Sequence, residues 1–403
     1  MLLLTSTSKS TQKILSLSFV FTLALQSVPA SAQVDVKTMI STIESPLKNG
    51  ESELDKLSLE QLMEKLRVPG MSIAVIKDFK LHWAKTYGVI DAQSGKALNL
   101  QTRFQAASIS KPITAMAAMR MVQDGRLNLD TDVNTYFKSL RIPANPAFPN
   151  QAITPRSLFS HTSGAADGFG FPGYEPDATL PTTEEILEGK LPSNVGKILF
   201  TEAPFQVSKY SGGGVMFMQL AMRDISGRPF ADLMRTSVLQ PLAMHDSSFV
   251  QAKNLEGNPN AALAHDEAGQ RFAAPWHVYP ELATSGLWTT PSDLAKVIIA
   301  MQNALLGKDE NLLTQQSARE MITPVSVGRF GIGWSISQRN NGWYFSHSGA
   351  NWGYRAWAIG HIRKGYGLVV MTNSDSGMSL INQVVDRVES AYNWDSRPTA
   401  SSR

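Results

Sequence analysis

The 403-residue sequence contains no cysteine. Disulfides, thiolate nucleophiles and cysteine-ligated metal sites are therefore excluded. An excess of charge of one sign is also missing, since 37 basic residues face 34 acidic ones and the formal net charge is +3. Without basic runs, neither nucleic acid nor an anionic membrane surface is expected as the main partner. After the first 32 residues, no apolar stretch is long enough to suggest a membrane span.

The first 32 residues have the layout of a secretory leader. Lys9 and Lys13, with no acidic residue among them, precede an apolar stretch from Ile14 to Leu25, and a run of small residues ends at Ala32. This order predicts a signal peptide over residues 1–32 that is removed after Ala32. The mature chain would then carry a charge of +1, be periplasmic or secreted, and have no membrane contact. An uncleaved membrane anchor is the alternative.

The most informative motif is Ser-x-x-Lys from Ser108 to Lys111. The same spacing occurs by chance elsewhere, twice in the leader and once around Pro46, so context has to decide. Here Pro112 is tolerated in the first turn of a helix, and the apolar run from Ile113 to Val122 predicts that this helix is buried. The hydroxyl and the amine would lie one turn apart on one face. A buried, partly neutral lysine can remove a serine proton, so the motif predicts serine acyl transfer.

Tyr210, which precedes Ser211 and three glycines, is a candidate proton relay. A phenol near cations is expected to have a lowered pKa and to pass a proton to a leaving group. The glycines allow a tight turn and a close approach of the substrate. An ordinary loop tyrosine is the alternative.

A third motif, His347-Ser348-Gly349-Ala350, follows an alternating run that predicts a strand. The edge of this strand could hold an extended substrate. Gly349 would let the backbone come close, and the N–H groups of Ala350 and Ser108 could stabilise a developing oxyanion. His347 could join the proton network of Tyr210 or bind a substrate carboxylate, although a structural histidine is the alternative. The other histidines lack the spacing of a metal site, and no cofactor is expected.

Strand patterns at both ends of the chain enclose a middle region of short helices and loops. Helical spacing predicts a helix from Met378 to Tyr392, and helical patches at Thr183–Leu187 and Val215–Ile225 lie between loops rich in proline and glycine, such as Pro143–Pro181. The predicted antiparallel strands are Ser72–Ile76, Leu81–Val89, Trp343–Ser346, Tyr354–Gly360 and Gly367–Thr372. Together these patterns predict one sheet with flanking helices.

In the order of its three motifs, the chain resembles the serine hydrolases related to class C β-lactamases, DD-carboxypeptidases, D-aminopeptidases and family VIII esterases. The likeness extends over most of the mature chain. It rests further on Val68–Ser72, Phe104–Ser108, Asp124–Asp130, Leu158–Gly164, Pro241–Met244, Ser285–Trp288 and Phe330–Trp334, which resemble family signatures.

The resemblance implies an α+β fold of the β-lactamase/transpeptidase type, with an antiparallel sheet flanked by helices and a mostly helical lobe. A single bilobed domain would span residues 33–403. Its α/β lobe would comprise about 33–130 and 284–403, and its helical lobe about 131–283.

The resemblance also assigns roles to the motif residues. Ser108 would be the acylated nucleophile, Lys111 its base and Tyr210 the proton relay, while the N–H groups of Ser108 and Ala350 would form the oxyanion hole. His347 stands where the β-lactamases carry a lysine.

Two departures from the β-lactamase pattern predict poor hydrolysis of antibiotics. Gly212 replaces an asparagine whose amide would bind the acyl-amide of a β-lactam, and His347 weakens the positive charge for its carboxylate. His161, within a signature of the family's fold, is expected to be structural.

The sequence thus predicts an exported serine hydrolase that cleaves amide bonds of small or linear peptides, including nonribosomal peptides or those with D-residues, through an acyl-enzyme on Ser108. Its partner would be a small peptide or ester, and the oligomeric state stays open. A carboxylesterase, a weak β-lactamase and a non-catalytic penicillin-binding module are the alternatives.

Overall fold

The computed structural model describes residues 30–48, 50–168 and 170–397, with side chains from Asp35 on. The predicted leader lies outside this part except for its last three residues, which begin helix α1 (Ala30–Glu44). Within the described ranges, no helix combines the length and the apolar character needed to cross a membrane.

Six antiparallel strands form the main sheet, in the order β2-β1-β8-β7-β6-β5. The five predicted strands are confirmed. The short edge strand β5, with the polar sequence SISQR, lacks a clear alternation and was not predicted. The strands are β1 (Gly70–Lys77), β2 (Lys80–Gly88), β5 (Ser335–Arg339), β6 (Gly342–Asn351), β7 (Tyr354–His361) and β8 (Gly367–Thr372).

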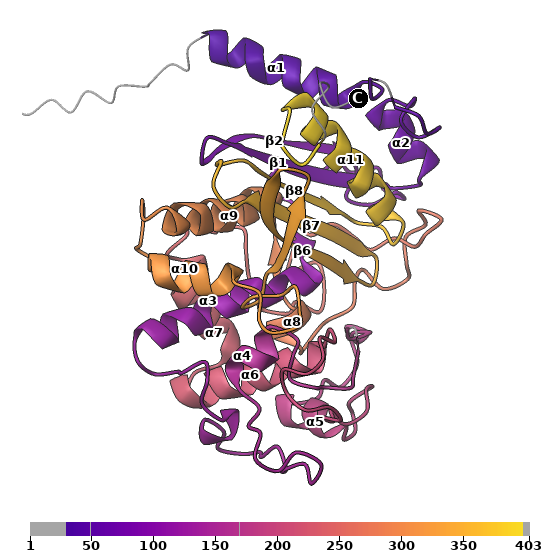
Figure 1. Cartoon of the computed structure of the whole chain (residues 1–403). Coiled ribbons are helices and arrows are strands. Elements are labelled where there is room, and N and C mark those ends of the chain that lie inside the picture. Colours follow the sequence, from indigo (N-terminus) through magenta and orange to yellow (C-terminus); the bar gives the residue numbers. More distant parts are fainter. Residues whose placement is uncertain (1–29, 49, 169, 398–403) are drawn as a thin grey trace, which may run out of the picture.

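Helices cover both faces of this sheet (Figure 1). Helix α11 (Gly377–Ala391), which confirms the predicted C-terminal helix, packs on β7 and β8, with α1 and α2 (Leu59–Lys65) beside it. On the other face lies α9 (Pro291–Leu305), which Thr290 caps and which begins with a proline. No helix was predicted for this stretch, although the cap and the proline are both start signals for a helix.

The remaining helices form a lobe on the α9 side of the sheet, and α3 (Ser110–Gln123) runs between this lobe and the sheet (Figure 1). The exact boundaries of the two expected lobes stay a prediction. The lobe and its surroundings contain η2 (Val133–Thr135), α4 (Pro155–Phe159), α5 (Thr183–Glu188), α6 (Gly212–Ser226), α7 (Phe230–Met234), η3 (Arg235–Leu239), α8 (Leu282–Ser285), α10 (Gln315–Ile322) and the small sheet of β3 (Phe104–Gln105) and β4 (Trp288–Thr289).

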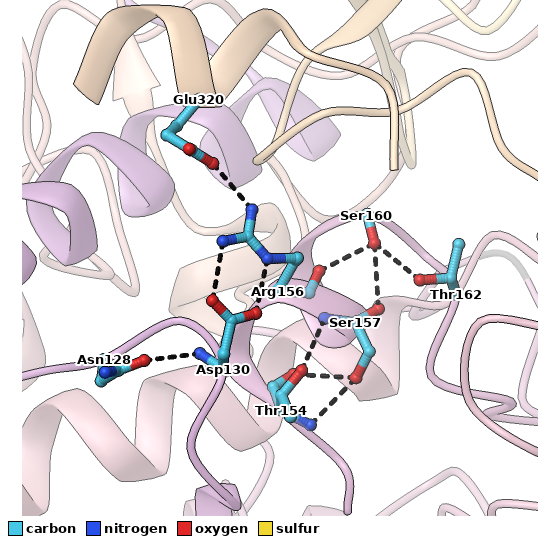
Figure 2. A network of polar contacts seen from close by, with 8 residues as sticks. All are labelled: Asn128, Asp130, Thr154, Arg156, Ser157, Ser160, Thr162 and Glu320. Carbon is cyan, nitrogen blue, oxygen red and sulfur yellow. Dashed lines mark hydrogen bonds and ion pairs between the residues drawn. The ribbon is translucent and has the colours of Figure 1, made fainter. Parts of the chain in front are cut away.

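A polar network fixes the loop that follows α4 (Figure 2). Arg156 donates from Nε and Nη2 to the two carboxylate oxygens of Asp130, at 2.7 and 2.9 Å, and from Nη1 to Glu320 of α10, at 2.7 Å. The hydroxyl of Ser160 donates to the Arg156 carbonyl at 2.7 Å and lies 2.8 Å from the hydroxyl of Thr162. Two other segments, at Asp130 and Glu320, therefore anchor α4 directly before the loop that carries His161.

Candidate active site

Ser108 lies in a 3₁₀ turn, η1 (Ala107–Ile109), directly before α3. The spacing alone predicted that Ser108 and Lys111 share one regular helix. Instead, Ser108 lies in η1 and Lys111 lies in the first turn of α3. Ala107 has a φ of +50°, a left-handed conformation that costs free energy for a residue with a side chain. Ser110 stabilises this turn, because its hydroxyl donates to the Ala107 carbonyl at 2.6 Å and accepts from the Leu287 N–H at 3.0 Å.

The Lys111 amine lies 3.0 Å from the Ser108 hydroxyl and 3.2 Å from the carbonyl oxygen of Thr284 in α8. The side chain of Lys111 is completely buried. Burial lowers the pKa of this amine to about 7, and the nearby Asp167 carboxylate opposes the shift. A large part of Lys111 is therefore neutral near pH 7, as proton abstraction from Ser108 requires.

Tyr210 reaches the same serine from the helical lobe. Its hydroxyl forms a hydrogen bond with Ser108, and its ring centroid lies 4.9 Å from Nζ of Lys111. The predicted lowering of the Tyr210 pKa is wrong. Burial raises this pKa, and the Asp167 carboxylate raises it further, so the phenol is protonated at neutral pH. The desolvation of the phenolate outweighs the hydrogen bond from Ser108 and leaves Tyr210 as a proton donor.

The turn after Tyr210 is held by Asp167, which the sequence analysis missed. Ser211 caps α6 by accepting from the Gly214 N–H at 2.7 Å. Its hydroxyl donates to one oxygen of Asp167, and the Gly213 N–H donates to the other at 2.8 Å. An exposed aspartate in a loop rich in proline and glycine, more than 40 residues before its partners, has no sequence signal that would identify it.

His161 supports the ring of Tyr210. The two ring centroids are 4.3 Å apart, and Nδ1 of His161 accepts from the Ser211 N–H at 3.2 Å. His161 is buried and has a φ of +59°. Its pKa is held well below the usual value, first by burial and then by Lys111 and His347. A neutral, immobile imidazole in this position agrees with the structural role expected for His161.

Strand β6 offers a free edge beside the turn that carries Ser108. The Trp343 carbonyl accepts from the Ile362 N–H at 3.0 Å, so the odd-numbered residues of β6 direct their main-chain groups toward β7. The even-numbered residues point to the opposite edge. Among the described residues, β5 pairs with that edge only as far as Ser346. Ser348 and Ala350 are exposed there, with main-chain groups that can pair with an extended ligand.

Gly349 lets this edge approach the turn that carries Ser108. A Cβ atom on Gly349 would lie only 2.2 Å from the carbonyl oxygen of Ala106, so only glycine fits there without a shift of the backbone. This close contact packs β6 directly against η1. The predicted oxyanion hole, built from the N–H groups of Ala350 in β6 and Ser108 in η1, therefore draws on two elements that pack against each other.

His347 is buried, and its Nδ1 lies 2.7 Å from the Ser348 carbonyl. A carbonyl only accepts, so Nδ1 carries the proton. Burial lowers the His347 pKa to about 3, and the charges of Lys111 and Arg329 act in the same direction. His347 therefore contributes a neutral hydrogen-bonding ring to the site, and it does not supply a cation for a substrate carboxylate at neutral pH.

The chain has recognisable relatives among known proteins. Protein flp of Staphylococcus aureus (strain N315) is 25% identical over 344 residues, which cover 81% of this chain and 64% of that protein. The chain thus spans a little less than two thirds of the length of this relative.

Two solved structures share the fold. One is EstCE1, described as a hydrolase with promiscuous acyltransferase activity. It matches with a TM-score of 0.68 at 18% identity, and the match covers 89% of this chain and 99% of the EstCE1 chain. The other is the D-amino acid amidase from Ochrobactrum anthropi SV3, complexed with D-phenylalanine. It matches with a TM-score of 0.66 at 20% identity, and the match covers 89% of this chain and 100% of the amidase chain. These similarities confirm the β-lactamase/transpeptidase-like fold.

The profile of the Beta-lactamase family matches residues 58–387. This range includes the sheet, the helical lobe and each of the three motifs. The chain therefore belongs to the beta-lactamase family.

Proposed function

We propose that this protein is a serine hydrolase that cleaves amide bonds of small or linear peptides through an acyl-enzyme on Ser108. The observation that carries the proposal is the 3.0 Å contact between the Ser108 hydroxyl and a fully buried Lys111 amine whose pKa is lowered to about 7. An amine with this pKa can act as a general base at physiological pH. The leader-like first 32 residues support a periplasmic or secreted location.

In the acylation step, neutral Lys111 takes the proton of the Ser108 hydroxyl while the oxygen attacks the substrate carbonyl. The N–H groups of Ser108 and Ala350 bind the developing oxyanion. Tyr210, protonated at neutral pH, donates its proton to the leaving nitrogen and regains one from the Lys111 ammonium. The carbon–nitrogen bond breaks, and water then hydrolyses the serine ester with the same groups acting in reverse.

The free edge of β6 supports a peptide-like substrate over a compact one. An extended chain can pair with the main-chain groups of Ser348 and Ala350 as an added strand. The likeness to a D-amino acid amidase supports amides with D-residues as candidates. Digestion of a peptide library that contains both D- and L-residues, read by mass spectrometry, tests bond type, stereochemistry and end preference together. A complete absence of cleavage would refute the amide proposal.

Covalent labelling tests the nucleophile separately. A fluorophosphonate should modify Ser108, and the adduct can be located by peptide mass spectrometry. Ser108→Ala should abolish both labelling and turnover with an unchanged melting temperature, because it removes only one oxygen atom. Labelling at another serine would contradict the assignment.

A carboxylesterase is the second candidate, and the fold shared with EstCE1 supports it. An alkoxide leaves more readily than an amine, so the same groups would hydrolyse a small ester. Rates on p-nitrophenyl butyrate and on D-alanyl-D-alanine peptides distinguish the two activities. Ester turnover without any peptide turnover would favour the esterase.

A further inference from the structure

Beside Gly212, which has no side chain, the turn between Tyr210 and α6 binds the carboxylate of Asp167. The residues on both sides of Gly212, Ser211 and Gly213, donate hydrogen bonds to Asp167. Asp167 is nevertheless exposed. Each carboxylate oxygen can accept more than one hydrogen bond, so Asp167 keeps acceptor capacity for a ligand in the active site.

Asp167 lies near the reacting groups. Its charge raises the pKa values of both Lys111 and Tyr210, the two side chains that contact the Ser108 hydroxyl. No basic side chain donates a hydrogen bond to Asp167 or forms an ion pair with it within the described ranges. A carboxylate placed like this beside a catalytic serine is suited to bind a cationic group of the substrate.

The chemistry of an amino acid derivative limits which cation can reach this position. The α-amine is separated from the carbonyl carbon by a single carbon atom, so the two atoms lie about 2.5 Å apart. When the carbonyl is bound at Ser108, the α-amine is therefore held within the same small space. Its ordinary pKa of about 7.7–8.0 means that it is mostly charged at pH 7.

We propose that Asp167 binds the free α-ammonium group of the residue whose carbonyl Ser108 attacks, so that the preferred substrates are amino acid amides and peptides with an unblocked amino terminus. The proposal rests on the amide hydrolysis proposed above and narrows its substrate class. The interaction also links binding to catalysis. A bound ammonium offsets the carboxylate charge that holds protons on Lys111, and so favours the neutral base.

The test compares two substrates that differ only in this charge, D-alanine p-nitroanilide and N-acetyl-D-alanine p-nitroanilide, together with their L-isomers, at pH 7. The wild-type enzyme should prefer the free amine in kcat/KM by about tenfold or more. In Asp167→Asn this preference should fall to about one, mainly through the free-amine substrate. The part of the effect on Lys111 that does not depend on the bound ammonium changes both substrates equally and cancels in the ratio.

Asp177→Asn is the matched control, since it removes the same charge from an exposed position in the same loop region. It should leave the substrate preference unchanged. An asparagine oxygen can still accept from the Gly213 N–H, so we expect Asp167→Asn to fold, and an unchanged melting temperature would show that it does. An equal loss on both substrates, or a wild-type preference for the N-acetyl substrate, would overturn the proposal.

The amide proposal and the ammonium proposal can fail separately. If neither anilide is hydrolysed, amide cleavage is refuted, and the corresponding pair of p-nitrophenyl esters measures the same ratio. A preference for the free-amine ester that depends on Asp167 would still support the ammonium site. Equal rates on the two esters in the wild-type enzyme would refute it.

Discussion

The pH dependence of catalysis should report the ionisation of Lys111. With an ordinary lysine pKa, only about one amine in 3,000 would be neutral at pH 7. With the pKa lowered to about 7 by burial, half are neutral at that pH and about one in ten at pH 6. Because the base must be neutral, kcat/KM should fall about tenfold for each pH unit below 7. It should reach a plateau above pH 8.

The assay uses p-nitrophenyl butyrate, which has no titrating group, from pH 5 to 9. His161 and His347 have lowered pKa values, and Tyr210 a raised one, so none of them titrates near pH 7. Asp167→Asn should move the midpoint to lower pH, because the Asp167 carboxylate raises the pKa of Lys111. A flat profile between pH 5 and 8, or a midpoint that moves upward in the variant, would refute this reasoning.

Three other predictions concern packing, stability and substrate range. Gly349→Ala should lower the fluorophosphonate labelling rate at least tenfold, because its Cβ would collide with the nucleophile turn, whereas Gly196→Ala, with no atom within 4 Å, should not. Burial raises the pKa of the Glu281 carboxyl to about 8, so the native state holds this proton while the unfolded chain releases it above about pH 4.5. The melting temperature should therefore fall between pH 5 and 8, and Glu281→Gln should weaken this fall; an equal fall in the variant would contradict the assignment. Nitrocefin should be hydrolysed at least a hundredfold more slowly than the best amide or ester, because Gly212 offers no amide and His347 no cation; comparable rates would contradict this.

Much of the fold could be predicted from local patterns. Apolar runs bounded by turn residues located β1 and β8, which are buried on both faces, and also β2, β6 and β7. Helical spacing located α11, which buries one face. The pattern failed for β5, which is short and polar, and α9 was overlooked despite its clear capping signals.

Some residues of the candidate site could likewise be predicted from local patterns, and others could not. Ser108 and Lys111 were found because they are three residues apart, and a spacing is visible in the sequence. Asp167 was not found, because its contacts with Ser211 and Gly213 join loops far apart in the chain. The support of Tyr210 by His161 likewise depends on how α4 and α6 pack.

The sequence by itself determined the family, the order of the reactive groups and most strands of the sheet, since these follow from local spacing and hydrophobic pattern. Only the tertiary structure decided the ionisation of those groups. Burial lowers the pKa of Lys111 and raises that of Tyr210, against the expectation for Tyr210. The physical reason is that desolvation depends on every segment that surrounds a charge, and these segments meet only in the folded chain.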